Sequence, residues 1–317
     1  MIASAIAQAP DNRREAPARA EPHHIVVVIP AYNEDRFIGS VVLKARQAAQ
    51  TVIVVDDGSS DRTRLIAEAA GAVVVRHEAN QGKGSALNTG LAAARARQPD
   101  VVVFLDADGQ HDPLDIPALI EPLLQGQADI VTGSRFLQRL NRAPAYRRFG
   151  QRVITALTNA TSGVKVTDSW SGFRALSRRA AERVRFQESG WGIEPEIQFQ
   201  ASTHGLVMVD VPVDVAYHEP AKRNPLGHAL RTLQGLLRLV GRHRPILLLS
   251  GAGMLMGLAG LGAGLWVVDR YAKLHMLPGG IALLSVSLVI LGVLTLYTAL
   301  ILSFLRELIP RRRDPDA

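Results

Sequence analysis

The chain of 317 residues contains no cysteine. Disulfide bonds and thiol catalysis are therefore excluded, and the composition fits a site in the cytoplasm. Nine histidines are present, but none has the spacing of a zinc motif such as His-Glu-x-x-His, so zinc chemistry is not expected. Residues 1–22 lack an apolar segment of signal-peptide length, and their alanine, proline and mixed charge predict a disordered tail.

A nucleic-acid recognition module is also missing, although the chain is basic. The 36 Lys and Arg residues against 29 Asp and Glu residues give a formal charge of +7. Positive charge without such a module favours phosphate ligands and anionic lipid as partners over nucleic acid.

The first half of the chain alternates short apolar runs with stretches of helical length, at residues 37–50, 61–70 and 84–97. Buried strands that alternate with helices predict an α/β fold, a Rossmann-like and mostly parallel sheet with helices on both faces. A Ser-Ser-Asp cluster at 59–61 is able to cap the second helix. The strands are expected at Ile25–Ile29, Val52–Val55, Val73–Val75, Val101–Leu105 and Ile130–Val131.

Polar clusters follow the first, second and fourth of these runs, at residues 30–34, 56–61 and 106–111. Ligands of open parallel sheets bind beyond the carboxyl ends of the strands, so the three clusters predict one crevice. Asp106-Ala107-Asp108 offers two hard oxygen ligands one residue apart, which suits Mg²⁺ or Mn²⁺ bound together with a diphosphate.

Five motifs in this order resemble those of the family-two inverting glycosyltransferases with the GT-A fold. The closest branch contains dolichyl-phosphate mannose synthase and the bacterial polyprenyl-phosphate glycosyltransferases, and the resemblance covers roughly residues 24 to 220. The motifs are Pro30-Ala31-Tyr32-Asn33-Glu34, Asp56-Asp57-Gly58-Ser59-Ser60-Asp61, Asp106-Ala107-Asp108-Gly109-Gln110-His111, Gly133-Ser134-Arg135 and Asp168-Ser169-Trp170-Ser171-Gly172-Phe173-Arg174.

The resemblance implies a donor side of the crevice. Pro30, Tyr32 and Glu34 would border the nucleotide base and ribose, and Asp57 would meet the base edge or the ribose. The glycine-rich stretch with Gly82 and Lys83 would support the donor site; it is not a Walker loop, because that motif's first glycine is missing. Asp106, Asp108 and Gln110 would hold the metal and the donor diphosphate. The residues alone leave open that Asp56 and Asp57 merely cap the next helix.

The resemblance also implies an acceptor side. Arg135, with Arg147 or Arg148 and with Arg174, would meet the acceptor phosphate, since a guanidinium can grip two phosphate oxygens. Asp168 would act as a base or position the acceptor, with Glu194 or Glu196 as less favoured choices. Asp108, Asp168 and Arg135 are therefore the expected catalytic residues. Pairing of Arg135 with a surface carboxylate remains the structural alternative.

The last quarter of the chain has two stretches free of charge, Ile246–Val268 and Gly279–Leu305. Each is long enough to cross a hydrocarbon core of about 30 Å as a helix, which predicts a transmembrane hairpin over 245–306, with spans at about 246–268 and 281–303. A buried hairpin of a soluble core is the alternative. Two Gly-x-x-x-Gly pairs, at 253/257 and 260/264, allow either close packing of the two helices or homo-oligomers.

Arginines flank both ends of the hairpin, so the positive-inside rule predicts that the catalytic domain and both termini face the cytoplasm. They are Arg238, Arg242 and Arg244 before it and Arg306, Arg311, Arg312 and Arg313 after it. Residues 223–244 are predicted to form a juxtamembrane amphipathic helix that lies in the lipid interface. The alternative is that this helix packs on the catalytic domain. Its expected apolar face comprises Leu226, Leu230, Leu233, Leu237 and Val240.

The expected organisation is a tail (1–22), a cytoplasmic catalytic domain (23–222), the amphipathic helix (223–244), the hairpin (245–306) and a basic tail (307–317). The expected reaction moves a sugar with inversion from a UDP- or GDP-linked donor to dolichyl or undecaprenyl phosphate in the inner membrane. Another lipid or polysaccharide acceptor is the alternative, but residues 187–191 lack the Gln-x-x-Arg-Trp of processive synthases. A non-catalytic membrane scaffold is less favoured, because Asp106, Asp108 and Arg135 are intact.

Overall fold

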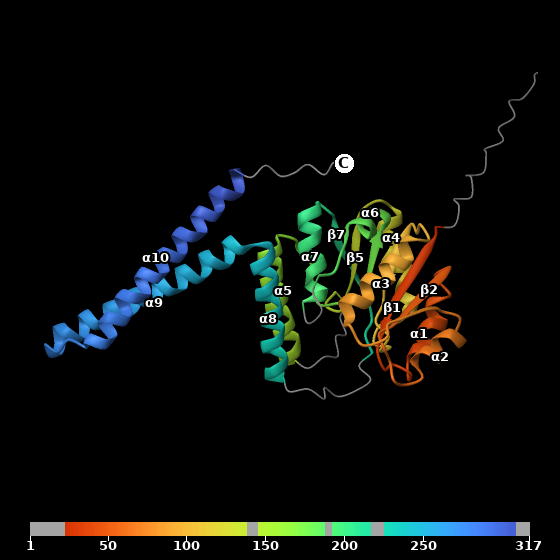
Figure 1. The fold of residues 1–317 in the computed structure, drawn as a ribbon, viewed down its shortest axis with the longest axis horizontal. Helices are drawn as coiled ribbons and strands as arrows, with labels where there is room; N and C mark the ends of the chain where they lie inside the picture. The colour runs from red at the N-terminus through yellow and green to blue at the C-terminus, as the bar shows by residue number, and fades with distance from the viewer. Residues whose placement is uncertain (1–22, 138–144, 188–191, 217–224, 309–317) are drawn as a thin grey trace, which may run out of the picture.

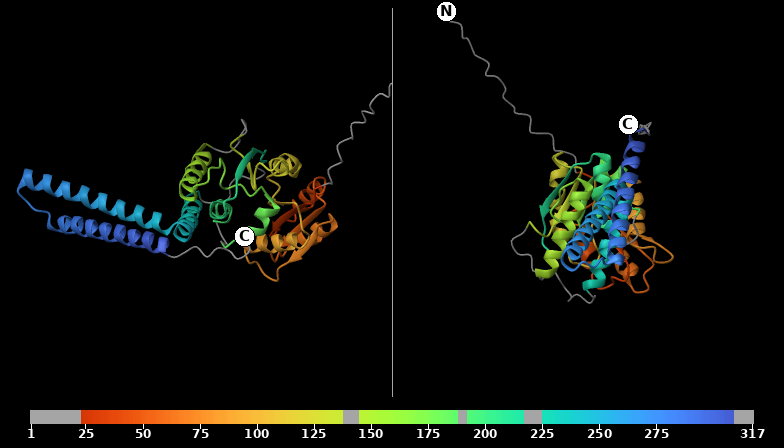
Figure 2. Two further views of the ribbon diagram at one scale, coloured as in Figure 1. Left: turned by 90° about the horizontal axis from the view of Figure 1, so that it is seen from above. Right: turned by 90° about the vertical axis from the view of Figure 1, so that its left-hand side faces the viewer.

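The computed structural model describes residues 23–137, 145–187, 192–216 and 225–308 (Figure 1). The predicted tail at 1–22 and residues 309–317 lie outside the described residues. The chain forms a sheet domain, a pair of neighbouring helices and a long helical hairpin that extends away from the domain (Figures 1 and 2).

Within the described residues, seven strands form one sheet in the order β3-β2-β1-β4-β6-β5-β7. The central strand β1 pairs in parallel with β2 and β4, so that Val28 lies opposite Ile53 on one side and Phe104 on the other. The strands are β1 (Ile25–Ala31), β2 (Thr51–Asp56), β3 (Val73–Arg76), β4 (Val101–Phe104), β5 (Ile130–Ser134), β6 (Arg174–Ser177) and β7 (Met208–Pro212). The predicted mostly parallel sheet is confirmed, and each predicted strand is present.

Strand β6 runs antiparallel between β4 and β5, and β7 forms the far edge. Arg174, the first residue of β6, lies opposite Phe104 at the carboxyl end of β4. The segment 168–173 before β6 therefore reaches the same edge of the sheet as the loops after the parallel strands. This insertion brings the last of the five motifs to the crevice.

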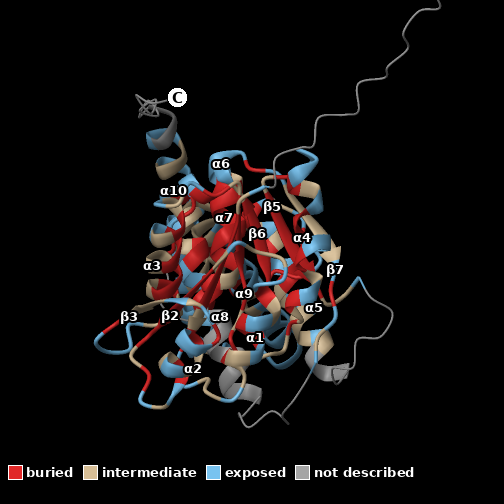
Figure 3. Ribbon diagram, turned by 90° about the vertical axis from the view of Figure 1, so that its right-hand side faces the viewer, coloured by how far each residue is buried: buried red, intermediate tan, exposed pale blue. Residues whose placement is uncertain are grey.

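Helices cover both faces of the sheet, as predicted from the alternation of strands with helices. Successive residues of a strand point to opposite faces, so each strand contributes side chains to both helical layers. Val27 and Val54 face the layer of α1, α2 and α4, whereas Val26 and Ile53 face the layer of α3, α6 and α7. Figure 3 shows the buried sheet between these layers. The helices are α1 (Ile38–Ala45), α2 (Thr63–Ala69), α3 (Lys83–Arg95), α4 (Ile116–Leu124, preceded by the 3₁₀ turn Pro113–Asp115), α6 (Arg178–Arg183) and α7 (Ile193–His204).

Helices α5 (Ala145–Ser162) and α8 (Pro225–His243) lie side by side between the sheet domain and the hairpin (Figures 1 and 2). Leu236, Leu239 and Val240 of α8 are buried and form a small core with Phe199 of α7. Leu237, on the predicted apolar face, is instead exposed. The carboxyl half of α8 thus packs on the domain, the alternative that the sequence left open. The side chains of Leu226, Leu230 and Leu233 lie outside the described residues.

Helices α9 (Pro245–Leu274) and α10 (Gly279–Leu308) form the predicted hairpin. Both are long and apolar enough to cross a membrane, and only 11% of the most apolar part of each is buried. This low burial argues against a soluble core as their surroundings.

Glycines form the seam between the two hairpin helices. A Cβ at Gly260 would lie 2.8 Å from the backbone nitrogen of Val289, and one at Gly253 would lie 2.8 Å from the carbonyl oxygen of Gly292. The Ser285 hydroxyl donates a hydrogen bond of 2.8 Å to the carbonyl of Gly260. Of the two roles that the sequence allowed for these glycines, the structure shows close packing within one chain.

Candidate functional site

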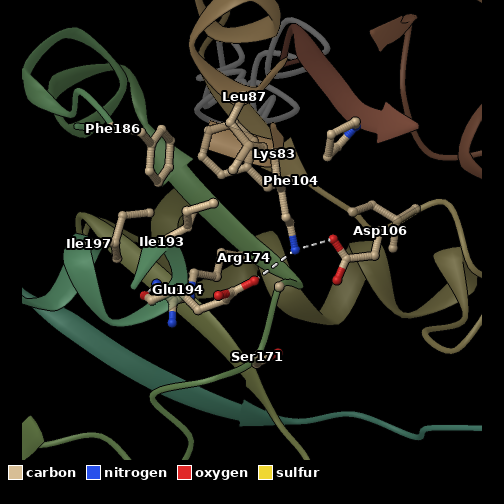
Figure 4. A pocket seen from close by; sticks show the side chains of 13 residues that line it. Lys83, Leu87, Phe104, Asp106, Ser171, Arg174, Phe186, Ile193, Glu194 and Ile197 are labelled. Carbon is tan, nitrogen blue, oxygen red and sulfur yellow. Dashed lines mark hydrogen bonds and ion pairs between the residues drawn. The ribbon is translucent and has the colours of Figure 1, made fainter. Parts of the chain in front are cut away.

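Asp106 lies at the carboxyl end of β4, beside a lysine from α3 and a glutamate from α7. The ammonium of Lys83 is 2.6 Å from Asp106 Oδ1 and 2.9 Å from Glu194 Oε1 (Figure 4). Burial would raise the pKa of Asp106, but the neighbouring Lys83 holds that pKa below its usual value. Burial acts against the charged form of Lys83 as well, yet the two carboxylates raise its pKa. Asp106 and Lys83 are therefore both ionised at neutral pH.

The pocket around this lysine is small and partly open, with a volume of about 20 Å³. Its wall is apolar apart from the charged groups and includes Leu87, Phe104 and Ile197 (Figure 4). A larger cleft of about 400 Å³ is lined in part by the 109–112 loop and by Phe37. The space beside the lysine is about that of one water molecule.

Asp108 and Gln110 continue the same loop, where the Asp108 carboxylate accepts a hydrogen bond of 3.0 Å from the Gln110 backbone. Among the described residues, no three His, Cys, Asp or Glu side chains lie close enough to hold a metal ion by themselves. The carboxylates of Asp106 and Asp108 nevertheless fit Mg²⁺ or Mn²⁺, because these ions are commonly bound by one or two carboxylates with water and phosphate oxygens completing the shell.

Gly172 lies directly against the Asp106 carboxylate. A Cβ at this position would lie 2.2 Å from Asp106 Oδ2, so any other residue would displace the carboxylate from its present position. Gly172 belongs to the last of the five motifs, and no local sequence pattern explains why it is a glycine. The reason is steric, and it depends on the antiparallel insertion of β6.

Arg135 and Asp168, predicted as separate catalytic residues, form a bidentate ion pair. The Nε and Nη2 atoms of Arg135 donate to the two Asp168 oxygens at 2.6 and 2.8 Å. Burial would raise the pKa of Asp168, but hydrogen bonds and charge from Arg135 lower it. Asp168 therefore stays ionised and fixes the plane of the guanidinium at the carboxyl end of β5. The alternative for Arg135 was an ion pair with a surface carboxylate. The structure instead pairs Arg135 with Asp168, which is fully buried.

The other predicted acceptor arginines differ in their surroundings. Arg174 is buried, donates to the backbone carbonyls of Ser169 and Glu194, and has its pKa lowered to about 10 by burial. It joins the 168–173 segment to the first turn of α7. Arg148 is partly exposed on α5, and the side chain of Arg147 lies outside the described residues.

Asp57 anchors the glycine-rich loop. Its carboxylate is buried and accepts hydrogen bonds from the backbone of Gln81 and Gly82 at 2.9 and 2.8 Å. The ring of His77, which sequence reasoning missed, lies 2.7 Å from the same carboxylate and 2.9 Å from the Thr89 hydroxyl. The loop thereby delivers Lys83 to the first position of α3.

The loop after β1 is tied to the loop after β2. The Glu34 backbone donates to the Thr63 hydroxyl at 2.8 Å, and Tyr32 is half exposed beside it. Pro30 lines the pocket that contains Asp106. Asp61 accepts a hydrogen bond of 2.9 Å from the Thr63 backbone at the start of α2, but the N-cap position of this helix is Arg62, which makes no side-chain cap. The three predicted loops therefore meet at one crevice.

His111 is a further buried group that the sequence singled out only as part of a motif. Its ring packs against Phe173, and burial lowers its pKa to about 4. The imidazole is consequently neutral at physiological pH and adds no charge beside Asp106.

Comparison with known proteins gives one consistent result. Residues 26–185 match the sequence profile of Glycosyl transferase family 2. The UDP-N-acetylglucosamine–dolichyl-phosphate N-acetylglucosaminyltransferase of Methanococcus voltae is 32% identical over 217 residues, which cover 62% of this chain and 86% of that protein. Glycosyltransferase AglJ of Haloferax volcanii is 29% identical over 300 residues, which cover 92% of this chain and 97% of that protein.

A solved structure with the same fold is glucosyl-3-phosphoglycerate synthase from Mycobacterium tuberculosis. In complex with Mn²⁺, UDP and glucosyl-3-phosphoglycerate it matches with a TM-score of 0.55 and 28% identity, over 69% of this chain and 80% of that chain. The same protein has also been crystallised with Mg²⁺ and UDP. The described fold is thus similar to one that binds a nucleoside diphosphate with a divalent cation.

Proposed function

Because this chain belongs to glycosyl transferase family 2, we propose that it transfers a sugar from a UDP- or GDP-linked donor to a polyprenyl phosphate at a membrane. A relative that uses dolichyl phosphate, by its name, supports the acceptor class. The protein is a glycosyltransferase; the donor, the acceptor and the membrane insertion form the proposal.

One observation carries the proposal: the crevice of Asp106 and Lys83 belongs to a domain that continues without a linker into an apolar hairpin. Helix α9 begins at Pro245, two residues after α8 ends, and the Arg244 guanidinium between them donates to Ser202 Oγ at 3.0 Å and to the Ser162 carbonyl at 3.3 Å. The hairpin is therefore fastened to α5 and α7 of the domain. Such an arrangement suits an acceptor that itself resides in lipid.

On the donor side, Asp106 and Asp108 would hold a divalent cation, with Gln110 at the edge of the same loop. When bound, Mg²⁺ or Mn²⁺ would offset the charge that develops on the departing nucleoside diphosphate. Lys83, delivered by the loop of Gly82, would donate to a diphosphate oxygen. Pro30, Tyr32 and Glu34 would border the nucleoside, and Asp57 would keep the loop in position.

On the acceptor side, Arg135 would present its guanidinium to the lipid phosphate, oriented by Asp168. Arg148 on α5 and Arg147 would add positive charge, and Arg174 would support the segment that carries Asp168. A phosphate oxygen forms the bond to the anomeric carbon as the bond from that carbon to the diphosphate oxygen breaks. Because the phosphate is already anionic, no strong base is required. Attack from the opposite face inverts the anomeric centre.

The arginines on both flanks of the hairpin would face the cytoplasm, and with them the catalytic domain and both termini. The acceptor phosphate and the nucleotide sugar would then meet on one side of the membrane. The exposed apolar surface of α9 and α10 would be covered by lipid.

The test uses full-length protein in lipid vesicles, a panel of labelled nucleotide sugars and polyprenyl phosphate. One donor is expected to move its label into the organic phase when Mg²⁺ or Mn²⁺ is present. The variant Arg135→Lys should lose transfer far more than nucleotide-sugar affinity, because an ammonium cannot reproduce the guanidinium fork. Label that stays entirely in the aqueous phase for every donor would rule out a lipid phosphate acceptor.

A further inference from the structure

Lys83 and Asp106 make a contact that a divalent cation on Asp106 must break. The ammonium lies 2.6 Å from Asp106 Oδ1, and a cation bound to the same oxygen would lie within a few ångströms of it. Like charges at that separation repel strongly in a partly buried pocket. Either the carboxylate or the lysine therefore has to move when the cation binds.

Asp106 has less freedom to move than Lys83. Its Oδ2 atom lies against Gly172, where even a Cβ would be 2.2 Å away. The carboxylate follows β4 directly, and Phe104 and Leu105 before it are buried. Lys83, by contrast, reaches Asp106 through a four-carbon side chain at the first turn of α3. Of the two side chains, that of Lys83 is the longer and can change its position more easily.

The structure provides a second place for the ammonium. Glu194 Oε1 is already 2.9 Å from it, so the lysine can release Asp106 while keeping Glu194. Among the described residues that line this pocket, Asp106 and Glu194 are the carboxylates. The side chains of Leu87, Phe104 and Ile197 form an apolar wall that offers no other partner (Figure 4).

Glu194 is itself held in place. It lies in the first turn of α7, and its backbone carbonyl accepts a hydrogen bond of 2.5 Å from Arg174 Nη1. Arg174 is fixed by β6, the strand beside Asp106. The backbone that carries the Glu194 side chain is therefore tied to the sheet through Arg174.

We infer that Lys83 exchanges between two carboxylates: it neutralises Asp106 in the free protein and shifts onto Glu194 when a divalent cation and a diphosphate bind. Glu194 is thus a positioning residue that acts through Lys83, and not a base. This inference rests on the cation and donor site of the proposed function, but on neither the sugar nor the lipid. On Glu194, the ammonium retains donors for a diphosphate oxygen, since it carries three N–H groups.

The test is a titration of full-length, detergent-solubilised protein with Mn²⁺ alone, by calorimetry or Mn²⁺ electron paramagnetic resonance. Lys83→Met should bind Mn²⁺ roughly tenfold more tightly than the unmodified protein, because the competing charge is gone. Glu194→Gln should bind it about threefold more weakly, because Lys83 then keeps Asp106 as its one carboxylate partner in the pocket. Lys44→Met, which breaks the surface pair of Lys44 with Asp112, is the matched control and should leave Mn²⁺ affinity unchanged.

The double variant Lys83→Met/Glu194→Gln separates an indirect role of Glu194 from a direct one. If Glu194 acts through Lys83, the double variant should match Lys83→Met, because the glutamate has no ammonium left to hold. An equal loss of affinity from Glu194→Gln in both backgrounds would overturn that role. Unchanged or weaker binding in Lys83→Met, or equal tightening in Lys44→Met, would overturn the exchange.

Thermal unfolding of each variant shows whether it is folded, and Lys83→Gln serves as a second neutral side chain if Lys83→Met is not. The titration contains no sugar and no lipid, so its result can be interpreted even if no sugar transfer is detected. Normal sugar transfer, together with Mn²⁺ affinities that do not change as expected, would contradict the exchange of Lys83 and leave the proposed function in place.

Discussion

The sheet domain and the hairpin both contain long apolar stretches, yet they place these side chains in opposite surroundings. Val26, Val28 and Ile53 of the sheet are completely buried between two helical layers. Leu255 and Leu265 of α9 are 71% and 73% exposed. The domain therefore supplies its own apolar surroundings, whereas the hairpin presents most of its apolar surface outward. The charged groups of the crevice all lie in the domain, which fits the proposed division of chemistry in the domain and membrane anchorage in the hairpin.

The strongest test of this division changes the crevice alone. Asp108→Asn should lower transfer about 1,000-fold, because a ligand of the cation that offsets leaving-group charge is lost. Stability should change by no more than about 0.5 kcal/mol, because the amide oxygen still accepts from the Gln110 backbone. Transfer assays and thermal unfolding measure both effects, with Asp112→Asn as the surface control. Full activity of Asp108→Asn would end the case for a metal ligand here.

Removing the hairpin tests the division from the other side. Truncation after Arg244 keeps α8 packed on Phe199 and should preserve nucleoside-diphosphate binding, while transfer to long-chain polyprenyl phosphate falls about 100-fold through lost localisation. Short, water-soluble prenyl phosphates should be affected less. Calorimetry and parallel transfer assays give the two readouts. Loss of nucleotide binding would show that the hairpin is part of the domain's fold.

A truncation after Glu219 is the matched comparison. It removes Leu236, Leu239 and Val240 from Phe199 and should destabilise the domain by several kcal/mol relative to truncation after Arg244. Equal unfolding temperatures of the two truncated proteins would assign α8 to the hairpin rather than to the domain.

A substitution in the seam should disturb the hairpin alone. Gly260→Leu forces a side chain against the backbone of Val289 and Ser285 and should cost roughly 1 to 3 kcal/mol in detergent. Gly262→Leu, where a Cβ meets nothing within 4 Å, should be neutral. Nucleotide affinity should be the same in both variants. Equal effects of the two substitutions on unfolding would contradict the placement of Gly260 at the contact between α9 and α10.

The smallest expected effect is a pH dependence that belongs to the domain. The folded pKa of Asp168 lies below its ordinary value of 3.8, so this group contributes stability that is present above that value and lost as pH falls through the folded pKa. Asp168→Asn should be less stable at neutral pH, and its deficit should narrow below about pH 4. Unfolding of both proteins between pH 2.5 and 7 measures the gap. A deficit independent of pH would mean that the pair acts through packing and not through charge.

The sequence was sufficient for features that depend on local pattern. Five strands followed from β-branched runs, and the hairpin from two charge-free stretches. The crevice followed because carboxyl ends of parallel strands meet at one edge. Strand β6 was not predicted, since Arg174–Ser177 is short and has no alternation, and its antiparallel position depends on the whole sheet.

The contacts of the site were harder to predict for the same reason. Lys83 and Glu194 are 111 residues apart, and no local pattern pairs them. The anchoring of Asp57 by His77 and the Gln81–Gly82 backbone requires the register of β2 with β3. The sequence motifs indicated Arg135 and Asp168 as two separate site residues. Their ion pair depends on the sheet topology, which no local pattern predicts.

The sheet order has a consequence for self-association. Its open edges are β3 and β7, where unpaired backbone groups could template strands of another molecule. Strand β3 has only four residues and ends in Arg76, while β7 carries Asp210 and ends in Pro212, which has no N–H to offer a neighbouring strand. Short length, charge and proline thus protect both edges against aggregation. If the proposed membrane insertion holds, copies of the domain would gather at one surface, where edges that do not pair would keep them apart.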